Sequence, residues 1–340
     1  MKRRTLGRTG LDVSVIGFGG IPIQGVDGAE ADRIVAAALD VGIDFIDTAR
    51  GYTDSETKLG RALRGRREGV VLASKSMERT AEGMARDIER SLANLRTDMI
   101  DLYQVHNPGD DEQLDTVLGP GGALEALLEA RDAGKIRFVG ITGHSRSVIL
   151  RAIETDLFDT VQHPCNPLET AWLDEVNPLA RDKGLGTICM KPVAGGAFRN
   201  PAPAFRFSLA AGMDVLIPGM DSVEQVVENA KVGEGPLEPS EEDLAKIERV
   251  KERWEGAFCR RCGYCMPCPN GLNIPFLFLI EAYYARYDLK GWALERLAGL
   301  EKKYADCVGC GECVERCPYD LKIPDMMARA GTVVIPGERG

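Results

Sequence analysis

Residues 70–106, VVLASKSMERTAEGMARDIERSLANLRTDMIDLYQVH, contain one complete strand–helix–strand unit. A short apolar run at 70–74 is followed by a helix-like segment at 81–95 and by a second apolar run at 100–105. Two short apolar runs joined by a helix are typical of neighbouring parallel strands, because parallel strands need a crossover connection. The unit therefore predicts an α/β fold.

The same alternation extends in both directions, up to about residue 235. Further strand-like runs lie at residues 13–17, 45–47, 138–142, 160–162, 187–190 and 215–217, and the clearest further helices at 29–41, 123–133, 147–154, 173–183 and 223–231. Eight strand–helix units in succession predict a (β/α)8 TIM barrel. A doubly wound open sheet is the alternative, but it requires G-x-G-x-x-G after its first strand, and residues 17–22, GFGGIP, lack that spacing.

The length and charge of the chain argue against several classes of protein. With 340 residues, of which 44% are hydrophobic, the chain can form one large domain and one small domain. A net charge of −10 argues against a nucleic-acid-binding surface, and no apolar run is long enough for a membrane span. Asp12 and several glycines interrupt the segment after the basic start, so we expect no signal peptide and a cytoplasmic location.

Eight of the ten cysteines lie in the last quarter of the chain, in two runs that each end before a proline. The runs are Cys259, Cys262, Cys265, Cys268 and Cys307, Cys310, Cys313, Cys317. The second spacing, C-x2-C-x2-C-x3-C-P, is typical of bacterial two-cluster ferredoxins, and the first run is one residue shorter. Because a 4Fe–4S cluster needs four thiolate ligands, the runs predict two clusters.

In two-cluster ferredoxins, the cysteine before the proline binds the other cluster. On that pattern the ligand sets are Cys259, Cys262, Cys265 with Cys317, and Cys307, Cys310, Cys313 with Cys268. Zinc sites and disulfides are alternatives, although zinc sites usually combine separated C-x2-C pairs and disulfides require an oxidising compartment. We expect the other two cysteines, Cys165 and Cys189, to be ordinary buried thiols.

A segment rich in glycine and proline, residues 233–239, predicts the domain boundary. We expect the barrel to occupy residues 1–239. Residues 240–330 are expected to form a linker helix, starting at Ser240 and ending near Trp254, and an α-helical ferredoxin-like domain. Between the cysteine runs, residues 274–304 predict two helices with a break near Gly291.

Active sites of such barrels lie at the carboxyl ends of the strands, so polar residues at those ends are candidates for catalysis. Asp47, Lys75 and His106 follow three successive strand-like runs, and Tyr52 lies in the loop after Asp47. A nearby ammonium favours the phenolate and makes Tyr52 a better proton donor to a carbonyl oxygen. Lys75 supplies that charge, Asp47 holds Lys75, and His106 is placed to orient the carbonyl.

This set resembles the Asp–Tyr–Lys–His tetrad of the aldo/keto reductase superfamily. Four further segments resemble that family: LGRTGLDVSVIGFGG at 6–20, GKIRFVGITGHS at 134–145, residues 162–168, and IPGMDSVEQVVEN at 217–229. The signatures CGYCMPCPNGLNIP and CVGCGECVERCPYDLKIP resemble the group fused to a C-terminal ferredoxin-like domain. The resemblance implies an oxidoreductase that interconverts a small-molecule carbonyl and an alcohol.

The resemblance also implies a nicotinamide cofactor, NAD(P), across the barrel mouth. It places Thr142, His144, Gln162 and Asn166 at the nicotinamide end, and Pro218, Gly219, Ser222, Gln225, Glu228 and Asn229 at the adenosine phosphate end. Gly219 and Gln225 stand where NADP-selective members carry basic residues, and Asp221 between them would repel a 2′-phosphate. Lys191, at another strand end, is expected to face a phosphate, a substrate carboxylate or the tetrad.

Hydride transfer moves two electrons together, whereas a cluster passes one electron at a time. A flavin is a possible intermediary, since barrels often bind phosphate groups after strands seven and eight. An electron-transfer protein is a possible partner. Two other functions remain open: a ferredoxin- or flavin-linked reductase that no longer uses a nicotinamide, and an electron-relay protein on an inactive barrel.

Overall fold

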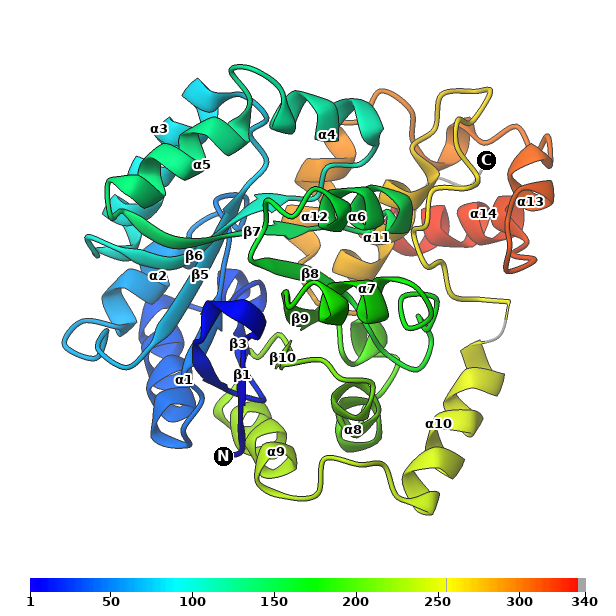
Figure 1. The fold of residues 1–340 in the computed structure, drawn as a ribbon. Coiled ribbons are helices and arrows are strands. Elements are labelled where there is room, and N and C mark those ends of the chain that lie inside the picture. Colours follow the sequence, from blue (N-terminus) through cyan, green and yellow to red (C-terminus); the bar gives the residue numbers. More distant parts are fainter. Residues whose placement is uncertain (255, 336–340) are drawn as a thin grey trace. The chain divides into compact units, whose positions relative to one another are not determined.

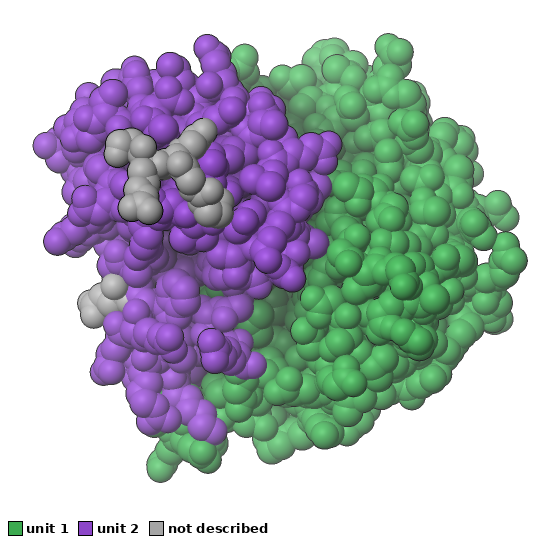
Figure 2. Space-filling view, turned by 180° about the vertical axis from the view of Figure 1, so that it is seen from behind, with its two compact units in different colours: residues 1–194, 200–245 green, residues 195–199, 246–340 purple. Residues whose placement is uncertain are grey.

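The structure is a computed structural model that describes residues 1–254 and 256–335 (Figure 1). Its contacts divide the chain into two compact units (Figure 2). The first unit comprises residues 1–194 and 200–245, and the second comprises residues 195–199 and the described residues from 246 onward. The first unit holds all the strands of the described chain.

Eight parallel strands form the sheet of the first unit, and they follow one another in chain order. They are β3 (Phe18–Gly19), β4 (Phe45–Asp47), β5 (Val71–Ser76), β6 (Ile100–His106), β7 (Ile136–Thr142), β8 (Thr160–Pro164), β9 (Gly186–Met190) and β10 (Val215–Ile217). Single bridges from Ile16 to Leu216 and from Gly19 to Gly219 join the two edges of the sheet. The predicted barrel is confirmed, because a doubly wound sheet reverses its strand order and this sheet does not.

The first barrel strand lies later in the chain than the hydrophobic pattern predicted. Part of the predicted run 13–17 belongs to β2 (Asp12–Ser14), which pairs antiparallel with β1 (Arg3–Thr5), and the first barrel strand is β3. Leu11 and Val13 are buried in the same apolar cluster as Phe45 and Val215, which begin barrel strands. The run is apolar because it fills the amino-terminal end of the barrel, and this burial gives the same pattern as a barrel strand.

Helices surround the strands, and α3 and α5 lie side by side on the outside (Figure 1). The helices up to residue 254 are α1 (Gly28–Asp40), α2 (Ser55–Ala62), α3 (Ala81–Leu95), α4 (Asp111–Leu118), α5 (Ala123–Asp132), α6 (Arg146–Glu154), α7 (Val176–Asp182), α8 (Ala202–Ala210), α9 (Val223–Glu234) and α10 (Glu241–Trp254). The predictions did not include α2, α4 and α8, which are short. Throughout the described residues, no helix has the length and apolarity needed to cross a membrane.

The inside of the barrel changes from apolar to polar along β4, β5 and β6. Phe45, Ala73 and Leu102 belong to the inner apolar cluster. Successive side chains of a strand point to opposite faces, so Asp47, Lys75 and Gln104, two residues further on, share the inner face toward the carboxyl end. These three strands therefore place buried polar groups at the carboxyl end of the barrel.

The second unit is helical and has its own apolar core. Its helices are α11 (Ile274–Ala285), α12 (Lys290–Ala298), α13 (Glu312–Glu315) and α14 (Ile323–Val334). The prediction of two helices with a break near Gly291 is confirmed: α11 ends at Ala285, and α12 begins at Lys290, one residue before Gly291. Leu289 is buried, and its carbonyl accepts the bond from Ala293 that starts α12.

The two cysteine runs continue into a short internal repeat. Both read C-P-x-x-L-x-I-P, at residues 268–275 and 317–324, and each copy leads into a helix with proline in its first turn, α11 or α14. The equivalent residues Gly271 and Asp320 both adopt positive φ, at 78° and 51°. The equivalent Leu272 and Leu321 are both buried in the core of this unit.

A prediction concerns Gly60 of α2. A Cβ on Gly60 would lie 2.3 Å from the carbonyl oxygen of Asn94 at the end of α3. Gly60→Ala is therefore expected to destabilise the protein by about 1–3 kcal/mol, although alanine in a free helix gains about 1 kcal/mol over glycine. Urea unfolding followed by circular dichroism measures this difference. Gly291→Ala is the control, since nothing lies within 4 Å of its Cβ; equal stability of the two variants would contradict the packing argument.

Candidate functional site

The four side chains of the predicted tetrad converge at the carboxyl end of the barrel. Lys75 Nζ donates to Asp47 Oδ1 at 2.6 Å and to the Thr48 carbonyl at 2.7 Å. The same Nζ lies 5.0 Å from the centre of the Tyr52 ring. The rings of Tyr52 and His106 meet edge to face, with centres 6.1 Å apart. The ends of β4, β5 and β6 and the loop after β4 thus bring together a carboxylate, an ammonium, an imidazole and a phenol.

The ion pair between Asp47 and Lys75 is buried, with each residue at most 2% exposed. Burial raises the pKa of Asp47, and the attraction of Lys75 opposes this rise. Burial lowers the pKa of Lys75, and Asp47 opposes that fall. Each charge therefore depends on the other, because neither is stable alone out of water. An ammonium held in this way beside Tyr52 favours the phenolate form of the tyrosine.

Gln104 is a buried member of this site that the sequence analysis missed. Its Nε2 donates to Gln162 Oε1 at 3.0 Å and approaches Asp47 Oδ2 at 3.4 Å. Gln104 precedes His106 by two residues on β6, so both side chains share one face of the strand. A polar residue two positions before His106, on the strand face that also carries apolar Leu102, was the signal that could have identified it.

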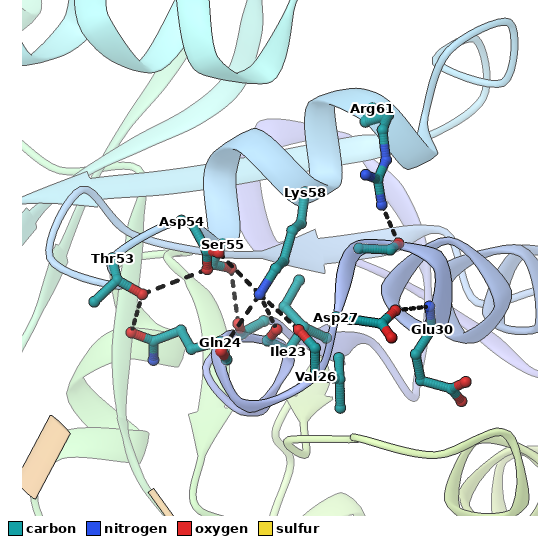
Figure 3. A network of polar contacts seen from close by, with 12 residues as sticks. Ile23, Gln24, Val26, Asp27, Glu30, Thr53, Asp54, Ser55, Lys58 and Arg61 are labelled. Atoms are coloured by element: carbon teal, nitrogen blue, oxygen red, sulfur yellow. Dashed lines mark hydrogen bonds and ion pairs between the residues drawn. The ribbon is translucent and has the colours of Figure 1, made fainter. Parts of the chain in front are cut away.

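Helix α2 fixes the loop that carries Tyr52. Figure 3 shows Lys58 of α2 reaching the loop after β3, where Nζ donates to the carbonyls of Ile23 and Val26 at 2.9 and 2.8 Å. Lys58 also pairs with Asp54 at 2.9 Å, two residues after Tyr52. The start of α2 is therefore tied to a neighbouring loop rather than left free in solvent.

A second anchor of the same loop is the buried carboxylate of Glu56, which is 1% exposed. Its four partners come from the loop, β5 and α3: Arg50 at 2.8 Å, Ser74 at 2.7 Å, Ser91 at 2.7 Å and Asn94 at 3.0 Å. The backbone N–H of Arg50 donates to the carbonyl of Lys75 at 2.9 Å. A buried carboxylate with all these donors is fully satisfied and holds the loop against the strand that carries Lys75.

The residues predicted for the nicotinamide end lie around the same mouth. Thr142 and Gln162 lie on β7 and β8, and both are buried. Asn166 Nδ2 donates to the carbonyl of Lys191 at 3.1 Å, and Lys191 Nζ lies 3.5 Å from His144 Nε2. The structure therefore brings these five residues to the ends of three adjacent strands.

The residues predicted for the phosphate end lie between β10 and the second turn of α9: Pro218, Gly219, Ser222, Gln225, Glu228 and Asn229. Ser222 caps α9, because its hydroxyl accepts the Gln225 N–H at 3.3 Å. The Gln225 side chain accepts the N–H of Asp221 at 3.0 Å. Glu228 is exposed and Asn229 is buried, so these two side chains differ in access to a ligand.

The eight cysteines of the second unit gather in two groups that mix the two runs. The pKa of Cys259 is raised to about 11, mainly by burial and to a smaller extent by its neighbours Cys262 and Cys317. Burial also raises the pKa of Cys313, with smaller contributions from neighbours in both runs, Cys307, Cys310 and Cys268. Each group thus takes three thiols from one run and one from the other.

A pocket in the second unit is lined by one of these groups, Cys268, Cys307, Cys310 and Cys313. In the described chain, no three His, Cys, Asp or Glu side chains converge tightly enough for a single metal ion. Four soft thiols suit an iron–sulfur cluster, and the spacing of the cysteine runs favours a cluster over zinc. The ten cysteines form no disulfide, and Cys165 and Cys189 are buried thiols as expected.

Comparison with protein families agrees with both units. The model of the aldo/keto reductase family matches residues 15–207, and that of a 4Fe–4S dicluster domain matches residues 258–321. L-Galactose dehydrogenase of Arabidopsis thaliana is 29% identical over 302 residues, which cover 73% of this chain and 94% of the relative. A 6-dehydroglucose reductase of Novosphingobium aromaticivorans is 30% identical over 240 residues, or 63% and 76% of the two chains.

Solved structures show the same relationship. The holo form of aldo-keto reductase AKR11C1 from Bacillus halodurans has a TM-score of 0.65 at 26% identity and covers 74% of this chain and 96% of its own. An aldo-keto reductase from Klebsiella pneumoniae, solved in complex with NADPH, has a TM-score of 0.61 at 26% identity, with coverage of 74% and 95%. The chain belongs to the aldo/keto reductase family and carries a 4Fe–4S domain at its carboxyl end.

Proposed function

We propose that this oxidoreductase interconverts a small-molecule carbonyl and an alcohol with a nicotinamide cofactor, and that it carries two 4Fe–4S clusters for electron transfer. The observation that carries the proposal is the buried Asp47–Lys75 pair, whose ammonium lies 5.0 Å from the Tyr52 ring. Such a pair stabilises charge on a tyrosine that exchanges a proton with substrate.

In the proposed reaction, Tyr52 is the acid and base. During reduction its hydroxyl donates a proton to the carbonyl oxygen, and Lys75 stabilises the phenolate that remains. His106 donates a hydrogen bond that orients the carbonyl, and Asp47 keeps Lys75 in place. A bound nicotinamide supplies or accepts the hydride at the substrate carbon.

The proposed nucleotide contacts are Thr142, His144, Gln162, Asn166 and Lys191 at one end, and Pro218, Gly219, Ser222, Gln225, Glu228 and Asn229 at the other. Lys191 and His144 together offer an oxyanion-binding pair, because their polar atoms are 3.5 Å apart. This pair suits a phosphate of the nucleotide or a carboxylate of the substrate. The carboxylate of Asp221 favours NAD over NADP.

We assign residues 1–239 to the barrel domain and 240–330 to the linker helix and the iron–sulfur domain. One cluster takes Cys259, Cys262, Cys265 and Cys317, and the other takes Cys307, Cys310, Cys313 and Cys268. The mixed grouping of the thiols supports this crossed assignment. A flavin or an electron-transfer protein would link one-electron and two-electron chemistry.

A second candidate is a reductase without nicotinamide, driven through the clusters by a ferredoxin or a flavin. Uncharged Gly219 and Gln225 and acidic Asp221 at the phosphate end favour it. An anaerobic titration separates the two: cluster bleaching by NADH or NADPH supports nicotinamide use. Bleaching by dithionite alone, together with no turnover of an aldehyde with either nucleotide, supports the second candidate or an electron relay.

Tyr52→Phe is predicted to lower carbonyl turnover by about 10²- to 10⁴-fold, because the proton donor is lost. The measurements are the reduction of 4-nitrobenzaldehyde by NADH or NADPH and the oxidation of L-galactose by NAD⁺ or NADP⁺. Tyr103→Phe is the control, since Tyr103 is buried and its hydroxyl bonds to Ser91 on α3. Unchanged turnover in Tyr52→Phe would exclude this tyrosine as the essential donor.

Asp47→Asn is predicted to leave Lys75 buried without a counter-charge. The pKa of Lys75 then falls further, and the free energy of unfolding drops by about 3 kcal/mol as the turnover falls. Urea unfolding measures the change in the free energy of unfolding. Asp12→Asn, which removes a carboxylate from an exposed pair with Arg3, is expected to change stability by less than about 1 kcal/mol. Similar losses of stability in Asp47→Asn and Asp12→Asn would contradict the argument that the two buried charges depend on each other.

The crossed cluster ligands are testable by combining cysteine variants. The triple variant Cys307→Ser, Cys310→Ser, Cys313→Ser is expected to keep about half of the iron, because one ligand set stays whole. Adding Cys317→Ser should remove the remaining cluster, whereas adding Cys268→Ser should not. Iron analysis and EPR of the reduced protein measure this. The opposite pattern would show that each run binds its own cluster.

A further inference from the structure

The internal repeat of the second unit allows its two cysteine groups to be compared position by position. Between the first two cysteines, the first run carries Arg260 and Arg261, whereas the second run carries Val308 and Gly309. The two runs therefore differ by two positive charges at equivalent places.

The backbone shows that Arg261 occupies a position suited to glycine. Its φ is 57°, and the equivalent Gly309 has φ 68°. The next pair of equivalent residues, Gly263 and Gly311, are glycine in both runs and have φ 83° and 85°. A long side chain in this left-handed region is strained, and such strain persists where the side chain has a use.

Both guanidinium groups act on the thiols of one group. The Arg260 guanidinium lies 3.9 Å from the centre of the Tyr319 ring, two residues after Cys317. The Arg261 guanidinium lies 6.0 Å from the centre of the Phe258 ring, directly before Cys259. In the chain, Arg260 directly follows Cys259 and Arg261 directly precedes Cys262, so the loop between two ligands of this group carries both charges. These charges therefore stabilise negative charge at this group of thiols.

Burial is the same at two of the four equivalent positions of the two groups and differs at the other two. The equivalent thiols Cys265 and Cys313 are each 8% exposed, and the equivalent Cys259 and Cys307 are both half-buried. Cys310 is exposed where Cys262 is half-buried, and Cys268 is half-buried where Cys317 is buried. Exposure to water stabilises a reduced cluster. This effect concerns the partial exposure of two ligands, whereas two full charges accompany the first run, so the charges dominate.

We propose that Arg260 and Arg261 raise the reduction potential of the cluster held by Cys259, Cys262, Cys265 and Cys317 above that of the other cluster. The inference rests on the two-cluster assignment proposed above. Reduction adds one electron and one negative charge to a cluster without making or breaking a bond. A single electron shared by the two clusters therefore resides at the arginine-flanked one.

The test is an anaerobic redox titration of the full holoprotein with dithionite, followed by EPR. Arg261→Gly and Arg260→Gln are each expected to shift one potential to a lower value and leave the other unchanged, while Arg261→Lys keeps the native value. Glycine adopts the left-handed backbone at this position without strain. A lower potential in Arg261→Gly therefore reports the lost charge and not a distorted loop. Arg296→Gln, which removes a guanidinium 4.1 Å from the Trp292 ring on α12, is the control and should change neither potential.

Arg261→Gly is then combined with the triple variant Cys307→Ser, Cys310→Ser, Cys313→Ser, which is expected to keep only the arginine-flanked cluster. A lower potential in this combined variant assigns the shift to that cluster. Unchanged potentials in Arg261→Gly and Arg260→Gln, or a shift confined to the other cluster, would overturn the inference. Iron sufficient for only one cluster in the native protein would instead overturn the two-cluster assignment. Failure of the inference and failure of the two-cluster assignment therefore give different results.

Discussion

The buried ion pair between Asp47 and Lys75 is the constraint on which the barrel site depends. Two charges out of water are stable only together, so β4 and β5 must hold them at 2.6 Å. The surrounding groups serve this geometry: Gln104 approaches the free oxygen of Asp47, and the carbonyl of Thr48 accepts from Lys75. The same pair positions a positive charge beside Tyr52, which links the stability of the barrel end to its chemistry.

The loop with Tyr52 is rigid for a related reason. Glu56 is a second buried carboxylate, and its partners on β5 and α3 fix the start of α2. Lys58 fixes the same helix to the loop after β3. The proposed role of Tyr52 requires a constant distance from the ammonium, and these anchors fix both ends of the loop that carries the tyrosine.

Much of the architecture and of the candidate site could be predicted from local patterns. The helix at residues 81–95 and the strand ends at Asp47 and His106 follow from hydrophobic periodicity, which is a property of neighbouring residues. The first strand was misplaced because Leu11 and Val13 are apolar for a different reason, burial at the barrel end. Gln104 was missed because a polar residue within a strand shows its role only once its partners across the sheet are known.

The sequence by itself determined the strand–helix alternation and the spacing of the cysteines, since both are set by residues close together in the chain. The ferredoxin pattern also predicted that Cys317 joins the thiols of the first run, and the strand-end positions predicted that Asp47 holds Lys75. Only the tertiary structure decided the contacts themselves: Lys75 and Asp47 lie 28 residues apart and meet at 2.6 Å because their strands are adjacent. The partners of Gln104 and the left-handed backbone of Arg261 likewise arise only when the whole chain folds, because no local pattern encodes proximity and burial.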